Sequence, residues 1–171
     1  MNILAPASAL RATVEANLPL GTDSLFRTQL IPELWDAAVA YGIDPVGMVA
    51  QSGKETGWGA FPGRVKPWFR NPFGVKVRFD REAMALVPTI DPDHPLVHQQ
   101  FPSWKVGAVA HAQHLRAYCN LPVTDLIVDP RYELVIGRHD VVRWSDLDGK
   151  WAGPTYGTEV EIVIQRLRGE L

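Results

Sequence analysis

The sequence has a single cysteine, Cys119, among its 171 residues, so no internal disulfide framework can stabilise the chain. It has no run of about 18 apolar residues, the length that a membrane-spanning helix requires. It also has no excess of one charge, because 17 basic and 19 acidic residues leave a net charge of −2. We therefore expect neither a nucleic-acid partner nor insertion into a membrane.

The first residues also lack the basic segment of a secretory signal peptide, and Pro6 and Arg11 interrupt their apolar stretch. We expect synthesis in the cytoplasm without a signal peptide. Residues 1–22 are interpreted as a preamble, with a short helix over residues 8–17, and residues 23–171 as one domain, because no repeat or linker divides them. The apolar fraction of 46% is typical of a domain that buries its own core, and we expect a monomer.

Helical periodicity is present at both ends of this domain and absent between them. Proline and glycine recur from residue 60 to residue 103, whereas residues 75–79 alternate like a strand and residues 96–101 could pair with them. A helical stretch is also expected over residues 125–137. The predicted fold class is α+β, mainly α, with a β-lobe at about residues 72–102 and a cleft between the two parts.

A short helix over residues 45–55 is the most informative element. Asp44 is a good N-cap, Pro45 suits the first helical position, and Gly57 can end the helix. The helix places Glu55 at the negative end of the helix dipole and beside Trp58, where a carboxylate is disfavoured and its pKa should rise. Glu55 is therefore a candidate general acid, and the alternative is a solvated glutamate at a helix end.

Two histidines fall on the helix that is predicted to begin at Ser103, with this serine as its N-cap. His111 lies on its apolar stripe, and His114 follows three residues later. Such a pair can bind a metal, but no neighbouring residues complete a set of ligands. We expect no metal and no cofactor, and we interpret His111 as a hydrogen-bonded core residue.

Four stretches together resemble a known family. Residues 51–59 read Gln-Ser-Gly-Lys-Glu-Thr-Gly-Trp-Gly, and residues 71–76 read Asn-Pro-Phe-Gly-Val-Lys. Residues 101–104, Phe-Pro-Ser-Trp, begin the helix that carries His111, and residues 151–156 read Trp-Ala-Gly-Pro-Thr-Tyr. In this order and spacing they resemble the motifs of the peptidoglycan-cleaving β-N-acetylglucosaminidases of bacteria and their phages.

The resemblance implies a lysozyme-like fold, in which a helical lobe and a small β-hairpin lobe flank a glycan-binding groove. It implies that Glu55 is the catalytic acid, that Asn71 lies in the groove loop and that Tyr156 lines the site. The sequence departs from the family pattern at Thr56, where serine is usual, and at Pro72, where leucine is usual. The closing motif also lacks its usual acid, but none of these changes removes a group that the chemistry needs.

Cleavage of a glycosidic bond also needs a group that tolerates positive charge at the anomeric carbon. Asp91, in Thr-Ile-Asp at residues 89–91, resembles an acidic position of the family and is the candidate base or stabiliser. Its alternative role is to cap a turn. Without a second carboxylate, the 2-acetamido group of the substrate could act as nucleophile, or a muramyl 6-hydroxyl could attack to give an anhydro product.

Aromatic side chains near these motifs are candidates for stacking on sugars. Trp68 lies in a basic, proline-rich loop and is expected to be exposed. Phe73 belongs to the second motif, and its alternative role is to pack in the core. The candidate substrate-binding residues are Asn71, Phe73, Tyr156 and Trp68.

The function that these observations predict is cleavage of peptidoglycan glycan strands, most simply by an endo-β-N-acetylglucosaminidase. A phage endolysin or a lytic enzyme of a virion or secretion machine would suit the missing signal peptide, with action on the cell wall after release by another route. The alternatives are a muramidase or lytic transglycosylase on the same fold, and a non-catalytic wall-binding or tail-structural module.

Overall fold

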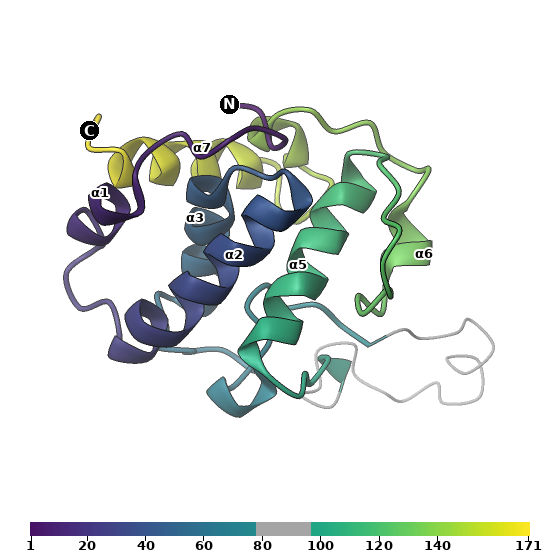
Figure 1. The fold of residues 1–171 in the computed structure, drawn as a ribbon, viewed down its shortest axis with the longest axis horizontal. Helices are drawn as coiled ribbons and strands as arrows, with labels where there is room; N and C mark the ends of the chain where they lie inside the picture. The colour runs from purple at the N-terminus through teal and green to yellow at the C-terminus, as the bar shows by residue number, and fades with distance from the viewer. Residues whose placement is uncertain (78–96) are drawn as a thin grey trace.

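The structure is a computed structural model that describes residues 1–77 and 97–171. Its regular elements are helical (Figure 1). In chain order they are α1 (Arg11–Ala16), the π-helical turn η1 (Phe26–Leu30), α2 (Ile31–Tyr41), α3 (Pro45–Thr56), the 3₁₀ turn η2 (Pro67–Phe69), α5 (Trp104–Tyr118), α6 (Tyr132–Val135), the 3₁₀ turn η4 (Trp144–Leu147) and α7 (Tyr156–Leu167). No helix in the described ranges is long and apolar enough to cross a membrane.

Helix α3 is the centre of the fold. It packs against α2 and α7, while α2 also packs against α5 (Figure 1). Every residue from Pro45 to Gly53 is buried, so α3 is surrounded by other elements rather than apolar on one face only. Gly47 permits close packing, because a Cβ there would lie 2.2 Å from the Trp144 ring.

The predicted ends of α3 are confirmed within one residue. Oδ1 of Asp44 accepts a hydrogen bond from the Val46 N–H at 3.0 Å and so caps the first turn. Gly57 has φ of 59°, a left-handed conformation that ends the helix just after Glu55 and Thr56. The Asp44 carboxylate also binds the backbone and hydroxyl of Ser8.

The predicted N-terminal helix is shorter than expected. Because Ser8 is engaged by Asp44, the first helix begins at Arg11 rather than at residue 8. The predicted cap of α5 is confirmed, since the Ser103 hydroxyl accepts a hydrogen bond from the Val106 N–H at 3.2 Å.

The helix that we expected over residues 125–137 is largely wrong. Only α6 forms there, and residues 126–129 are held by the Gln113 side chain of α5. The Gln113 amide donates to the Leu126 carbonyl, and its oxygen accepts from Val128 N–H and Asp129 N–H. These side-chain bonds satisfy backbone groups that a helix would otherwise have paired.

The predicted β-lobe is represented in the described residues by one antiparallel bridge between Lys76 and His98. The Val77 N–H donates to the Val97 carbonyl at 2.7 Å, and the Gln99 N–H donates to the Val75 carbonyl at 2.9 Å. These bonds bring the two ends of the predicted lobe together. The β-hairpin itself stays a prediction, and its tip falls outside the described residues.

Candidate active site

Glu55 lies in the last turn of α3, and its two carboxyl oxygens have different surroundings. Oε1 accepts a hydrogen bond from Trp151 Nε1 at 3.1 Å and another from the Tyr156 hydroxyl. Oε2 faces Gly74, since a Cβ built on that glycine would lie 3.4 Å from this oxygen. One oxygen is therefore anchored, while the other is available at the surface of a cavity.

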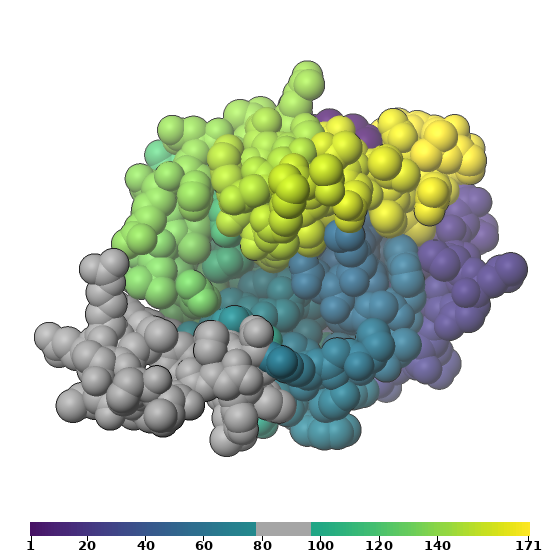
Figure 2. All heavy atoms as spheres, turned by 180° about the vertical axis from the view of Figure 1, so that it is seen from behind, coloured from purple at the N-terminus to yellow at the C-terminus, as the bar shows by residue number. Residues whose placement is uncertain are grey.

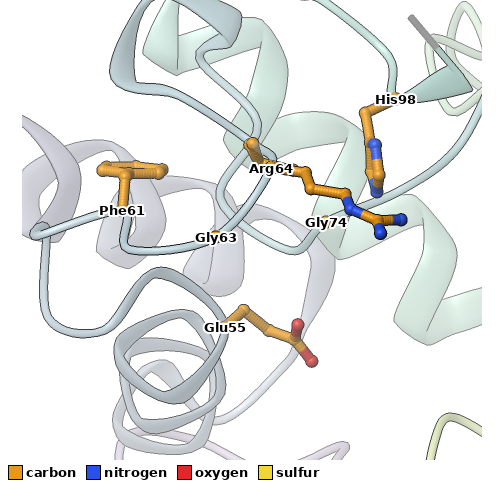
Figure 3. Close-up of a pocket in the computed structure, with 7 residues that line it drawn as sticks. Glu55, Phe61, Gly63, Arg64, Gly74 and His98 are labelled. Carbon is orange, nitrogen blue, oxygen red and sulfur yellow. The ribbon is translucent and has the colours of Figure 1, made fainter. Parts of the chain in front are cut away.

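That cavity has a volume of about 380 Å³, and we call it the Glu55 cavity. In Figure 3 the Glu55 side chain projects from the helix end, and Gly74, Arg64 and His98 lie across the cavity from it. Phe61, Gly63 and Val65 complete its described lining. Figure 2 shows this face of the molecule, where α7 and its preceding residues lie above the 60–75 segment.

Burial raises the pKa of Glu55 above the ordinary value of a glutamate. The hydrogen bonds from Tyr156 and Trp151 and the charge of Lys54 oppose this rise but do not cancel it. A carboxyl group in this setting keeps its proton at a pH where a solvated glutamate has lost it. Glu55 is therefore suited to donate a proton.

The neighbours of Glu55 differ in part from those that the sequence suggested. Trp58 packs against Gly53 and meets Phe26 edge-on at 5.5 Å, and it lines another cavity beside Lys54. The indole that is hydrogen-bonded to Glu55 belongs to Trp151, a residue of the closing motif that was not among the predicted site residues. The sequence feature that could have indicated this role is that Trp151 belongs to the same short motif as Tyr156 and precedes it by five residues.

Tyr156 is the predicted site residue that the structure brings directly to Glu55. It is the first residue of α7, and its ring stacks on Trp151 with a centroid distance of 6.1 Å. Burial, with a further contribution from the Glu55 charge, holds the pKa of Tyr156 well above its usual range. The phenol therefore stays protonated and donates to the carboxyl group.

Behind this pair lies a buried hydrogen bond between α3 and α5. His111 Nε2 lies 2.8 Å from Gln51 Oε1, and burial lowers the pKa of His111 well below its usual range. His111 is thus a neutral, hydrogen-bonded core residue, as predicted. The described residues include no group of three or more histidine, cysteine or acidic side chains that could hold a metal.

Asn71 is buried, and its amide supports the loop that carries Gly74. Nδ2 donates to the Val75 carbonyl at 2.8 Å and to the Gln99 carbonyl at 3.0 Å, while Oδ1 accepts from the Val75 N–H at 3.1 Å. These bonds occupy the amide, so Asn71 positions the loop in this structure. A direct contact of Asn71 with substrate stays a prediction.

Two other predicted residues, Phe73 and Trp68, do not contact Glu55 in the structure. Phe73 is buried, and its ring stacks on His111 with a centroid distance of 4.7 Å. It lines a second cavity, which shares Gly74 with the Glu55 cavity. Trp68 is 65% exposed and meets Phe69 edge-on, and it is not among the described residues lining the cavities near Glu55. Asp91 lies outside the described residues, so its role stays a prediction.

A carboxyl group that keeps its proton at the edge of an open cavity has the protonation state that a general acid needs. The class of protein follows from a comparison with protein families. The model of the glucosaminidase family, described as mannosyl-glycoprotein endo-β-N-acetylglucosaminidase, matches residues 31–169. The chain belongs to this family, which confirms the predicted membership among peptidoglycan-cleaving β-N-acetylglucosaminidases and the prediction of a glycoside hydrolase.

Two other comparisons were made, one with curated proteins and one with solved structures. No curated protein matches the chain in sequence. Among solved structures, the chain is similar to the catalytic domain of the autolysin Auto from Listeria monocytogenes, with 20% sequence identity and a TM-score of 0.48. That match covers 94% of this chain and 95% of the other.

Proposed function

We propose that this protein is an endo-β-N-acetylglucosaminidase that cleaves the glycan strands of peptidoglycan, with Glu55 as the general acid. The observation that carries the proposal is the asymmetric setting of the Glu55 carboxyl group. Tyr156 and Trp151 hold Oε1, burial raises the pKa, and Oε2 faces a cavity. A non-catalytic wall-binding module would not require this arrangement.

In the proposed reaction, the Glu55 carboxyl group donates its proton to the glycosidic oxygen while the bond from that oxygen to the anomeric carbon breaks. Water then adds to the anomeric carbon, and the proton that it loses returns to the Glu55 carboxylate, directly or through solvent, which restores the acid. Tyr156 and Trp151 stabilise the carboxylate that forms, because both donate to Oε1. The glutamate therefore gains hydrogen-bond stabilisation as it loses its proton.

Positive charge at the anomeric carbon needs a second group, and Asp91 is our candidate base or stabiliser. The routes without it use the substrate, either through its 2-acetamido group as internal nucleophile or through a muramyl 6-hydroxyl. The last route would make the protein a lytic transglycosylase, and cleavage on the other side of the muramoyl residue would make it a muramidase. A role in phage lysis, in a virion or in a secretion machine belongs to the same proposal.

The test is to assay wild type and Glu55→Gln on purified peptidoglycan and to identify the new chain ends. We expect the variant to lose about 10²- to 10⁴-fold in turnover, the contribution of general acid catalysis. Reducing N-acetylglucosamine ends would support the proposal, whereas reducing muramic acid or anhydromuramic ends would identify a muramidase or a transglycosylase. Equal turnover by both proteins would remove Glu55 from the mechanism.

Two controls separate catalysis from folding. Glu15→Gln removes a carboxylate whose partner is Arg11, a partly exposed pair on α1, so activity should not change. Glu55→Gln should be at least as stable as wild type at neutral pH. Because the pKa of Glu55 is raised on folding, the wild type loses stability as pH rises from the unfolded pKa through the folded pKa, and glutamine has no such loss.

A further inference from the structure

A second cavity, of about 320 Å³, adjoins the Glu55 cavity. Gly74 lines both cavities, and Trp151 lines the second one while its indole N–H donates to Glu55. We call it the Arg131 cavity. Its volume is at the lower end of the range of small-molecule sites, about 300–1,000 Å³.

Aromatic rings form much of its wall. Tyr118 and Trp151 lie with ring centroids 5.3 Å apart, and the His114 ring meets Trp151 edge-on at 5.1 Å. Phe73 lies against the same indole at 6.2 Å. Rings of this kind provide an apolar surface for the faces of a sugar.

Cationic side chains line the same cavity. Arg131 comes from the residue before α6, Lys150 comes from the turn after η4, and Lys76 comes from the bridged segment. Among the described residues that line it, none is an aspartate or glutamate. The cavity therefore combines an apolar wall with positive charge, which suits an amphipathic anion.

The backbone around both Arg131 and Lys150 is fixed by buried groups. Asp129 accepts the Arg131 N–H on Oδ1 at 3.0 Å, while its Oδ2 lies 2.7 Å from His114 Nδ1. The Tyr118 hydroxyl donates to the Lys150 carbonyl at 3.1 Å. Both oxygens of Asp129 are thus engaged within the protein, and Arg131 itself lines the cavity.

Tyr118 lies within the field of the arginine. Burial raises the pKa of the Tyr118 phenol, the positive charge of Arg131 opposes this rise, and the charge of Asp129 adds to it. The guanidinium group therefore acts on a phenol that itself lines the cavity. Guanidinium groups bind carboxylates through paired hydrogen bonds, whereas an ammonium group binds them as a point charge.

We propose that the Arg131 cavity is the subsite for a muramoyl residue next to the cleaved bond, and that Arg131 and Lys150 bind a carboxylate which that residue carries. This inference rests on the proposed function. The glycan alternates a neutral N-acetylglucosamine with a muramic acid whose lactyl group bears a carboxylate or a peptide. A sugar that is cut at Glu55 therefore has an anionic neighbour within one residue, and the adjoining cavity has the matching charge.

The carboxylate has two possible sources, the free lactyl group or the stem peptide. Soluble glycan fragments distinguish them when four forms are compared: with peptides, without peptides, and each of these after conversion of its carboxylates to neutral methylamides. Steady-state kinetics of wild type, Arg131→Gln and Lys150→Met on the four forms give KM and kcat separately. Arg166→Gln, an exposed charge on α7 that lines a different cavity, is the matched control.

We expect wild type to show a lower KM on the anionic forms than on their methylamides. Arg131→Gln should raise KM on the anionic forms by about tenfold, with little change in kcat or in KM on the neutral forms. An effect on fragments without peptides assigns the lactyl carboxylate, and an effect confined to peptide-bearing fragments assigns the stem peptide. Arg131→Lys should recover part of the loss, because it restores the charge.

For each variant, the KM is divided by that of wild type on the same form. The inference would be overturned if this ratio were the same for Arg131→Gln, Lys150→Met and Arg166→Gln on all four forms. Binding of the same fragments to Glu55→Gln protein, with and without the Arg131 change, repeats the measurement without turnover. If wild type cleaves no form, the proposed function fails, and the binding series still decides whether the cavity recognises a carboxylate. A merely structural role of Arg131 would weaken the binding of anionic and neutral forms alike.

Discussion

Replacement of Tyr156 by phenylalanine is the most direct test of how the site controls Glu55. The change removes the hydroxyl that donates to Oε1 and keeps the ring that stacks on Trp151. Because this hydrogen bond lowers the pKa of Glu55 against the effect of burial, its loss should raise that pKa further. The general acid must be protonated to act, so the alkaline limb of the activity profile should move to higher pH.

The size of the movement follows from the hydrogen bond that is lost. A hydrogen bond to a charged group contributes about 1.5–3 kcal/mol. The lower end applies here, because Trp151 remains as a donor and a protonated carboxyl group also accepts the bond. Since about 1.4 kcal/mol is a tenfold change in proton affinity, the limb should move upward by roughly one pH unit.

The assay is kcat against pH on soluble glycan fragments for wild type and Tyr156→Phe. Trp151→Phe should move the limb in the same direction by less, because the tryptophan hydrogen bond is the smaller of the two effects on Glu55. Tyr41→Phe is the matched control, since it removes a phenol that donates to a different carboxylate, Asp125. A limb that stays in place or moves to lower pH in Tyr156→Phe would refute the reasoning.

Two further predictions concern the loop and helix that frame the site. Asn71→Asp places a carboxylate against two backbone carbonyls that now accept from the amide, so urea unfolding at pH 7 should show a loss of about 1–3 kcal/mol; an unchanged midpoint would contradict this. Gly107→Ala puts a Cβ 2.2 Å from the Arg70 carbonyl oxygen, so the melting temperature should fall by the equivalent of about 1–3 kcal/mol. Gly153→Ala, with open space around it, is the control for the glycine substitution, and equal melting temperatures of the two variants would argue against this packing.

Local signals predicted the elements around Glu55 well. The Asp44 cap, the left-handed Gly57 and the Ser103 cap depend on residues within a few positions of one another, and the structure confirms each of them. The prediction over residues 125–137 was wrong because Gln113, on a distant helix, binds the backbone there. A side chain that satisfies backbone groups from outside the segment leaves no periodic trace in the segment itself.

The raised pKa of Glu55 was predicted in direction but partly for another reason. The sequence suggested the helix dipole and Trp58, whereas burial is the main cause in the structure. The groups that hold the carboxyl oxygen, Trp151 and Tyr156, lie 96 and 101 residues further along the chain. Such neighbours are set by the packing of α7 on α3, which local patterns do not specify.

By itself the sequence determined the family, the helix that carries Glu55 and the position of that glutamate at the helix end, because motif order and capping are local properties of the chain. The tertiary structure alone decided which groups meet there: the donors to Oε1, the cavity at Oε2, and the positive charges of Arg131 and Lys150 in the adjoining cavity. These groups come from segments far apart in sequence, and the packing of α7 on α3 and of α6 on α5 brings them together.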